Sequence, residues 1–358
     1  MSSRPATAGP SPDVMGRPSV VRGTLPRRGP LAVYGIAAAI VVALGLATDV
    51  NLALLALAGA AVAGAVVYTW SRRVEGRRRA FDRLMTLGVT SAFLLAVTPL
   101  VSLVHTVVAR GGARFDLEFF TDDARNVVGA GGGAMHAIIG TLVITGVATL
   151  FSVPIGVMAA VYMVEYGHGR LKKLLTFFVD VMTGIPSIVA GLFAYALFVI
   201  FFGPSVRLGV MGAVALSVLM IPIVVRSTEE VLKIVPNSLR EASYALGVSK
   251  WRTIVKVVLP TALAGIVTGS MIAVSRIIGE TAPLLITTGV FSSVNGNPFE
   301  GRMANLPVYI FNQYKYPGTP PDPYLDRAWA AALTLIVIVM VLFLAARLVY
   351  RRFGTEVR

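Results

Sequence analysis

The chain has 358 residues, of which 56% are hydrophobic and only 14% are charged. Soluble domains carry about 25% charged residues, and disordered chains are poor in apolar residues. The composition therefore excludes both classes and indicates a polytopic membrane protein. The sequence has no cysteine and only three scattered histidines, which excludes disulfide scaffolds and thiolate sites and predicts no metal centre.

The formal net charge is +14, which in a soluble protein would suggest a nucleic-acid partner. Here the basic residues cluster beside apolar runs, as they do in the cytoplasmic loops of membrane proteins. No basic stretch is interleaved with aromatic residues as in nucleic-acid readers. We therefore expect contact with membrane lipid and no binding of nucleic acid.

The first 83 residues are predicted to hold a tail, a hairpin and a linker. Residues 1–30 are rich in Pro, Gly, Ser and Arg without apolar periodicity, which indicates a disordered cytoplasmic tail. Two apolar runs follow, 31–48 and 52–70. A cleaved signal peptide is disfavoured, because the first run lacks a clear small-residue cleavage site and the second follows at once. We read 31–70 as a transmembrane hairpin and the arginine-rich 71–83 as a cytoplasmic linker.

Six further apolar runs are long enough to cross a bilayer, which takes about 20 apolar residues. They are 84–108, 136–164, 174–202, 208–226, 258–289 and 328–349. The three longest are expected to tilt, kink or extend past the bilayer. Prolines within the spans are tolerated because neighbouring groups can satisfy the freed carbonyls. These prolines are Pro99, Pro154, Pro186 and Pro222.

The loops between the spans predict an orientation. Basic clusters fill 71–83, 170–173 and 233–256 and the C-terminal end, whereas the other loops mix acidic and basic residues. One assignment satisfies every loop, with both termini in the cytoplasm and the mixed loops outside. The sequence thus predicts a multi-pass protein of the plasma membrane that ends in a cytoplasmic tail at 351–358.

The long cytoplasmic loop 227–260 is predicted to contain a short amphipathic helix. Apolar residues recur at helical spacing over 239–246, and Gly247 either stops the helix or lets a second backbone come close. The simplest interpretation is a helix that lies on the membrane surface.

The cytoplasmic loop reads EAS at 241–243, then Gly247, then VVLP at 257–260. This order of residues resembles the EAA loop of ABC importer permeases. The family pattern is E-A-A, three residues, glycine, nine residues and I-x-L-P; Ser243 and Val257 depart from it but keep size or branching. In that family the short helix docks in a groove of the ATPase subunit. The resemblance implies an ATPase-coupling role for Glu241, Ala242, Ser243 and Gly247.

The sequence points to a partner that hydrolyses ATP. It contains no G-x-x-x-x-G-K-[ST] phosphate loop, so a chain with an ATPase-docking helix must rely on a separate ATPase for ATP and magnesium. We expect this chain to bind no cofactor. An intramembrane enzyme is disfavoured and no catalytic residue is assigned, because no nucleophile–base or metal pair is apparent.

The seventh span contains Arg276 well inside apolar surroundings. A mid-membrane arginine costs about 2.5–3.5 kcal/mol on insertion scales, so it normally faces a protein interior or an aqueous path. Glu280 is expected on the same helix face, and Gly279 is expected to let another backbone approach. One interpretation is a structural ion pair that holds two helices together. The other is an anion pathway, to which Thr281 adds a hydroxyl and which Ser187 lines from a kinked span.

Other polar features of the sequence favour a structural role over contact with substrate. Glu165 and Asp180 lie near the cytoplasmic ends of spans, which favours a solvated interface over contact with substrate. The glycine-rich run 129–133 is weak evidence for a phosphate cradle and favours a joint between an outer loop and the next span.

RIIGETAPLL at 276–285 resembles the signature of the PstA-type membrane subunits of phosphate-specific ABC importers. Similar stretches are AVYMVEYG at 160–167, GIPSIVAGLF at 184–193 and LPVYIFNQ at 306–313. The resemblance covers about 84–350, the last six spans, and leaves the first hairpin and the tail without an inherited role.

This resemblance implies an all-α type I ABC importer transmembrane domain, a six-span core with an extra N-terminal hairpin, in a bacterial plasma membrane. It implies a non-catalytic subunit that translocates inorganic phosphate together with a PstC-type permease subunit, an ATPase dimer and an extracytoplasmic phosphate-binding protein. The pathway residues would be Arg276, Glu280, Thr281 and Ser187. Two alternatives stay open: a permease for another oxyanion and, from a different class, a stand-alone secondary transporter, in which the EAA loop would have no purpose.

Overall fold

The computed structural model describes residues 25, 26, 28–48 and 52–353. Among these residues the regular secondary structure consists of helices, with no β-strand. The all-α prediction is confirmed. Seven helices of the described part are long and apolar enough to cross a membrane, and a bent helix pair would make eight. The predicted tail 1–30 lies largely outside the described residues, as does 354–358.

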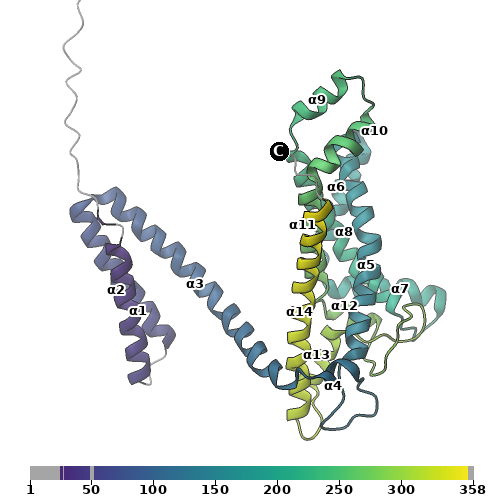
Figure 1. Ribbon diagram of the computed structural model, residues 1–358, viewed down its shortest axis with the longest axis horizontal. Coiled ribbons are helices and arrows are strands. Elements are labelled where there is room, and N and C mark those ends of the chain that lie inside the picture. The colour runs from purple at the N-terminus through teal and green to yellow at the C-terminus, as the bar shows by residue number, and fades with distance from the viewer. Residues whose placement is uncertain (1–24, 27, 49–51, 354–358) are drawn as a thin grey trace, which may run out of the picture. The chain divides into compact units, whose positions relative to one another are not determined.

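The chain divides into two compact units between Leu103 and Val104. In the first unit, α1 (Gly29–Ala47) and α2 (Leu52–Val74) pack side by side as a hairpin (Figure 1). Only two residues separate α2 from the helix α3 (Arg77–Gly111). The segment 71–83 is therefore helical except at its turn, because arginine is a good helix former.

A buried carboxylate closes the joint between α2 and α3. The carboxylate of Glu75 accepts hydrogen bonds from Arg83 at 2.8 and 2.9 Å and from the Ser71 hydroxyl at 2.7 Å. It also accepts one from the backbone N–H of Leu25 at 3.0 Å. Mainly because Arg83 donates to the ionised form, the pKa of Glu75 falls to about 2. The joint is thus tied to the start of α1.

The second unit is a helical bundle. Its helices are α4 (Leu117–Thr121), α5 (Met135–Val161), α6 (Gly169–Thr183), α7 (Ser187–Phe202), α8 (Gly209–Ile234), α9 (Asn237–Ala245), α10 (Lys250–Thr253), α11 (Leu259–Ile277), α12 (Ala282–Thr287), α13 (Leu306–Lys315) and α14 (Asp322–Phe353). α5 packs along α8, α11 packs along the same helix, and α7 packs against both α8 and α12. Fully buried apolar side chains of α5, α8 and α11, among them Ile144, Leu216, Met220 and Ile277, form its core.

Two predicted spans are broken. The span predicted at 174–202 consists of α6 and α7, which meet at 109°. Pro186 precedes the first residue of α7, and proline lacks a donor and forces the preceding residue out of the helical region, so it separates two helices instead of lying within one. The span predicted at 258–289 ends as helix α11 at Ile277, and α12 follows as a separate turn.

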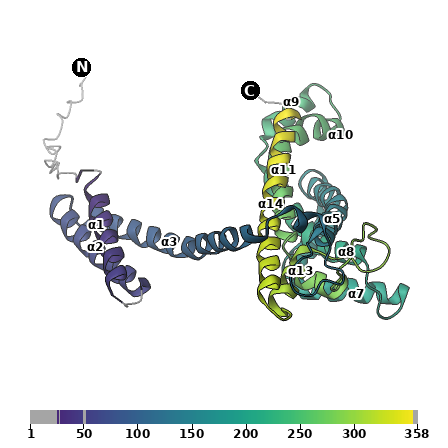
Figure 2. The same cartoon turned by 60° about the horizontal axis from the view of Figure 1, so that its bottom comes forward.

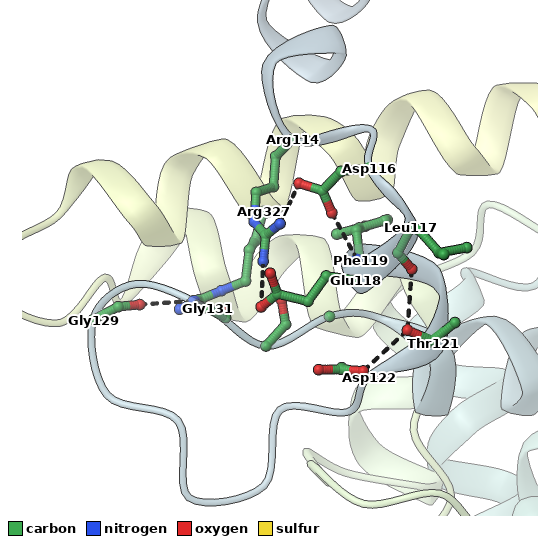
Figure 3. Close-up of polar contacts among 12 residues, drawn as sticks. Arg114, Asp116, Leu117, Glu118, Phe119, Thr121, Asp122, Gly129, Gly131 and Arg327 are labelled. Atoms are coloured by element: carbon green, nitrogen blue, oxygen red, sulfur yellow. Dashed lines mark hydrogen bonds and ion pairs between the residues drawn. The ribbon is translucent and has the colours of Figure 1, made fainter.

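At one end of the bundle, two arginines hold the loop that precedes α5 (Figure 3). Arg327 of α14 is 2% exposed and donates at 2.7 Å to the carbonyls of both Gly129 and Gly131. Arg114 donates at 2.9 Å to the carbonyl of Gly132 and pairs with Asp116 and with Glu118. The glycine-rich run thus joins a loop to α5, as predicted, and its carbonyls serve as acceptors for a buried arginine.

Close backbone contact holds the loop before α13 against α5. A Cβ on Gly140 would collide with the carbonyl oxygen of Ala304. One residue on, the Thr141 hydroxyl accepts from the N–H of Leu306 at 2.8 Å. Asn305 caps α13 by accepting from the N–H of Val308. This segment therefore docks on α5 through small residues and hydrogen bonds.

Candidate functional site

A cavity of 280 Å³ lies among α6, α7, α8 and α11. A water molecule occupies roughly 30 Å³, so the cavity has room for a small hydrated ion. Three of the four residues predicted to line a pathway border it: Arg276, Glu280 and Ser187. Leu219, Pro222 and Ile223 of α8 form part of the apolar wall.

The break between α6 and α7 places Ser187 at the cavity. Because the chain turns at Pro186, the hydroxyl group lies in the first turn of α7, beside the end of α6. Further along α7, a Cβ on Gly191 would lie 2.6 Å from the Cα of Pro283 in α12. The absence of a side chain at Gly191 therefore lets α7 pack directly on α12.

Arg276 lies in the last turn of α11, which ends at Ile277. A cation is favoured there by the partial negative charge of the helix C-terminus. The N–H of Glu280 donates to the Ile277 carbonyl at 3.1 Å, beyond the end of the helix. The prediction that Arg276 and Glu280 share one helix face is therefore wrong, and no ion pair joins them within the described residues.

Two neighbouring residues differ from expectation. A Cβ on Gly279 would meet no atom within 4 Å, so no described segment of this chain makes the expected close approach. Thr281 precedes α12 as its N-cap residue, is half-buried, and does not line the cavity.

A chain of ion pairs joins α6 to α8. Arg226 of α8 pairs with Asp180 of α6 and with Glu229, the latter at 2.8 Å. Lys233 extends the chain by bonding Glu229 at 2.7 Å. The exposed Asp180 agrees with the solvated role expected for it. Arg226 is the last residue of the predicted span 208–226, and the sequence pattern alone does not mark it as a site residue.

The predicted docking helix is present as α9, and its glycine has the expected stop geometry. Gly247 has a φ of +73° and its N–H donates to the Tyr244 carbonyl, while the N–H of Val248 donates to the Ser243 carbonyl. This is the Schellman pattern that ends helices. A Cβ on Gly247 would meet no neighbour, so its role in this chain is the turn.

The EAA residues face two directions. Glu241 and Ala242 are exposed. Ser243 is buried, and its hydroxyl shares a hydrogen bond of 2.8 Å with the Thr253 hydroxyl. Ser243 therefore holds α9 against the segment that follows it, whereas Glu241 and Ala242 are free to contact another protein.

A buried ion pair fastens α9 to the bundle. Arg240 donates to Glu165 at 2.7 and 3.1 Å and to the backbone carbonyls of Val235 and Leu232 at the end of α8. The Glu165 side chain is only 6% exposed. The solvated role expected for Glu165 is therefore wrong, because Arg240 supplies the buried partner.

Residues 152–358 match the family of binding-protein-dependent transport system inner membrane components. The chain belongs to this family. Within it, the chain is similar to phosphate transport system permease protein PstA 1 of Mycobacterium tuberculosis (strain CDC 1551 / Oshkosh), at 44% identity over 76% of this chain and 90% of the relative. It is also similar to phosphate transport system permease protein PstA of Yersinia pestis, at 36% identity over 78% of this chain and 94% of the relative. The predicted resemblance to PstA-type permeases is confirmed.

The fold of this inner membrane component also resembles a solved structure. The crystal structure of a bacterial ABC transporter involved in the import of the acidic polysaccharide alginate matches with a TM-score of 0.52 and 16% identity. The match covers 77% of this chain and 100% of that chain. At this identity the likeness shows the fold alone, that of an ABC importer transmembrane domain, as predicted.

Proposed function

We propose that this chain is the PstA-type membrane subunit of an ATP-driven importer that moves inorganic phosphate into the cytoplasm. The PstA proteins to which it is similar are named as permeases of phosphate transport systems. The observation that carries the proposal is the cavity in which Arg276, Glu280 and Ser187 meet.

The cavity offers the groups that an oxyanion needs. The guanidinium of Arg276 carries a permanent charge and donates to phosphate oxygens through charge-assisted hydrogen bonds. The hydroxyl of Ser187 adds a neutral donor. The carboxylate of Glu280 opposes the attraction of Arg276, so the anion is held weakly enough to leave. Thr281, at the start of α12, would join the pathway only if the helices around it move.

Arg276 is exposed in this single chain. A second, PstC-type permease subunit packed on this side would cover it and close the pathway between the two subunits. An exposed arginine at mid-membrane depth would otherwise be costly, which supports a heterodimer. An extracytoplasmic phosphate-binding protein would deliver the substrate to the other end of the pathway.

The ATPase dimer would bind at α9. The large apolar side chains of Leu239, Tyr244 and Leu246 are exposed there, beside Glu241 and Ala242. The ATPase would use ATP and magnesium, and this chain would bind no cofactor and carry no catalytic residue. In this orientation α9 and both termini lie on the cytoplasmic side of the bacterial plasma membrane.

The test is uptake of labelled phosphate by vesicles that hold the complete complex, the binding protein and ATP. We expect uptake that requires ATP, resists competition by sulfate and molybdate, and is lost in Arg276→Ala with assembly intact. Arg302→Ala is the matched control, because Arg302 is exposed outside the cavity, and it should transport normally. Full activity in Arg276→Ala would return this arginine to a structural role.

Two further outcomes would redirect the assignment. Equal competition by sulfate or molybdate would favour a permease for another oxyanion. Uptake by this chain without the ATPase would favour a stand-alone secondary transporter. Glu241→Arg should abolish ATP-driven uptake while leaving binding of phosphate to the binding protein unchanged, and intact uptake in this variant would contradict the coupling role of α9.

A further inference from the structure

The end of the first unit where α2 meets α3 presents a cluster of exposed arginines, here called the arginine belt. None of these side chains takes part in an ion pair or side-chain hydrogen bond within the described residues. The belt consists of Arg28, Arg72, Arg73, Arg77, Arg78 and Arg79.

Local contacts bring the belt together although it comes from the N-cap of α1, the end of α2 and the start of α3. The N–H of Leu25 bonds Glu75 at 3.0 Å, which places the start of α1 beside the α2–α3 turn. Gly29 lies against the ring of Trp70, since a Cβ there would be 3.1 Å from it. Figure 2 shows the start of α1, the end of α2 and the start of α3 at one end of the hairpin.

The belt has little internal counter-charge. Glu75 is buried and its charge is already matched by Arg83. The remaining carboxylate of this end, Asp82, is exposed and forms no ion pair with the belt among the described residues. An excess of positive charge therefore faces outward and attracts an external anion.

The arginines at the start of α3 do not help the helix. Arg77, Arg78 and Arg79 occupy its first turn, where no acidic residue is present. Cations at a helix N-terminus are unfavourable, because the partial charge there is also positive. Their clustering is therefore better explained by an outside partner than by helix stability.

The belt borders an apolar surface. Leu31 is 67% and Phe81 is 55% exposed on the adjoining turns of α1 and α3. Trp70 is 38% exposed, lies against Gly29 and stands two positions before Arg72 in α2; aromatic residues of this kind are enriched at membrane–water interfaces. This sequence of apolar, aromatic and basic surface places the belt at the depth of lipid headgroups.

We propose that the arginine belt binds the anionic headgroups of phospholipids in the adjoining leaflet and so anchors the hairpin. Clusters of four to eight basic residues next to a membrane helix attract anionic lipid. Guanidinium groups bind phosphate oxygens in a bidentate geometry. The proposal concerns the first unit alone and does not rest on phosphate transport.

The test uses Trp70 as a reporter in the full chain. Of the three tryptophans, Trp251 and Trp329 are changed to Phe, and the chain is placed in vesicles that mix phosphatidylglycerol with phosphatidylcholine. Either lipid is brominated near the headgroup in turn, so that quenching of Trp70 reports its nearest lipids. We expect brominated phosphatidylglycerol to quench Trp70 about threefold more than brominated phosphatidylcholine does. This preference should fall in 1 M salt, which shortens the Debye length to about 3 Å.

Two variants and one control decide the outcome. Changing the arginines at 72, 73, 77, 78 and 79 to Gln should lower the preference to about one, and changing them to Lys should keep most of it. The matched control replaces Arg170, Lys172 and Lys173, a basic cluster at α6, by Gln and should keep the preference.

Three results would overturn the proposal. The first is equal quenching by the two lipids in the unchanged belt. The second is a preference that survives the five Gln substitutions. The third is a preference that inorganic phosphate removes at constant ionic strength, which would assign the belt to free phosphate. If the Gln variant does not insert, the unchanged belt and the Lys variant still give the answer.

Discussion

Glu165→Gln should loosen α9 from the bundle. The Glu165 and Arg240 side chains are 6% and 13% exposed, and their closest N–O distance is 2.7 Å. Removal of one partner of a buried pair costs about 3–5 kcal/mol, since the other charge stays buried. Arg240 keeps its bonds to the carbonyls of Val235 and Leu232, so we expect a cost below this range, about 2–3 kcal/mol. That energy corresponds to a roughly 30- to 150-fold change in a local opening equilibrium.

The assay is hydrogen exchange of the α9 amides, 237–245, in the assembled protein. Exchange there should accelerate by that factor in Glu165→Gln, because α9 is fastened to the bundle through Arg240. Glu230→Gln is the matched control, since Glu230 is exposed on α8 and unpaired among the described residues, and it should leave exchange unchanged.

A second variant separates charge from packing. Glu165→Gln combined with Arg240→Met removes both charges and should recover part of the protection, because no buried charge is left without a partner. The reasoning fails if exchange in α9 is the same in Glu165→Gln as in the Glu230→Gln control.

Three further predictions concern glycines and the α2–α3 joint. Gly140→Ala should destabilise the protein by about 1–3 kcal/mol and lower its melting temperature, because the new methyl group collides with the Ala304 carbonyl. Gly146→Ala on the same helix meets no atom within 4 Å and should leave the melting temperature unchanged. Gly247→Ala should cost about 1–2 kcal/mol at its φ of +73°, seen as faster exchange at the end of α9, and Gly247→Asn should cost less. Because the pKa of Glu75 is lowered to about 2, the stability that it contributes is complete above its ordinary value, near 4.5, and is lost as the pH falls through 2. The melting temperature should therefore drop more between pH 5 and pH 2 in the wild type than in Glu75→Gln, and equal drops would refute this.

The sequence by itself determined the elements that depend on local pattern. Apolar runs predicted the hairpin 31–70 and the long helices, because a membrane span requires uninterrupted apolar surface. Helical spacing followed by Gly247 predicted α9, because the left-handed turn that ends it favours glycine. The cost of burying Arg276 in a membrane, together with Glu280 and Ser187, pointed to residues that the fold brings to one cavity.

Only the tertiary structure decided which side chains face each other. Arg240 meets Glu165 across 75 positions, and Arg327 meets Gly129 across 198. Periodicity in one segment carries no information about a partner so distant. The inward orientation of Ser243 likewise depends on Thr253 in the next helix. Local pattern specifies which residues can form a helix, whereas the direction of a polar side chain follows from the donor or acceptor that another segment supplies.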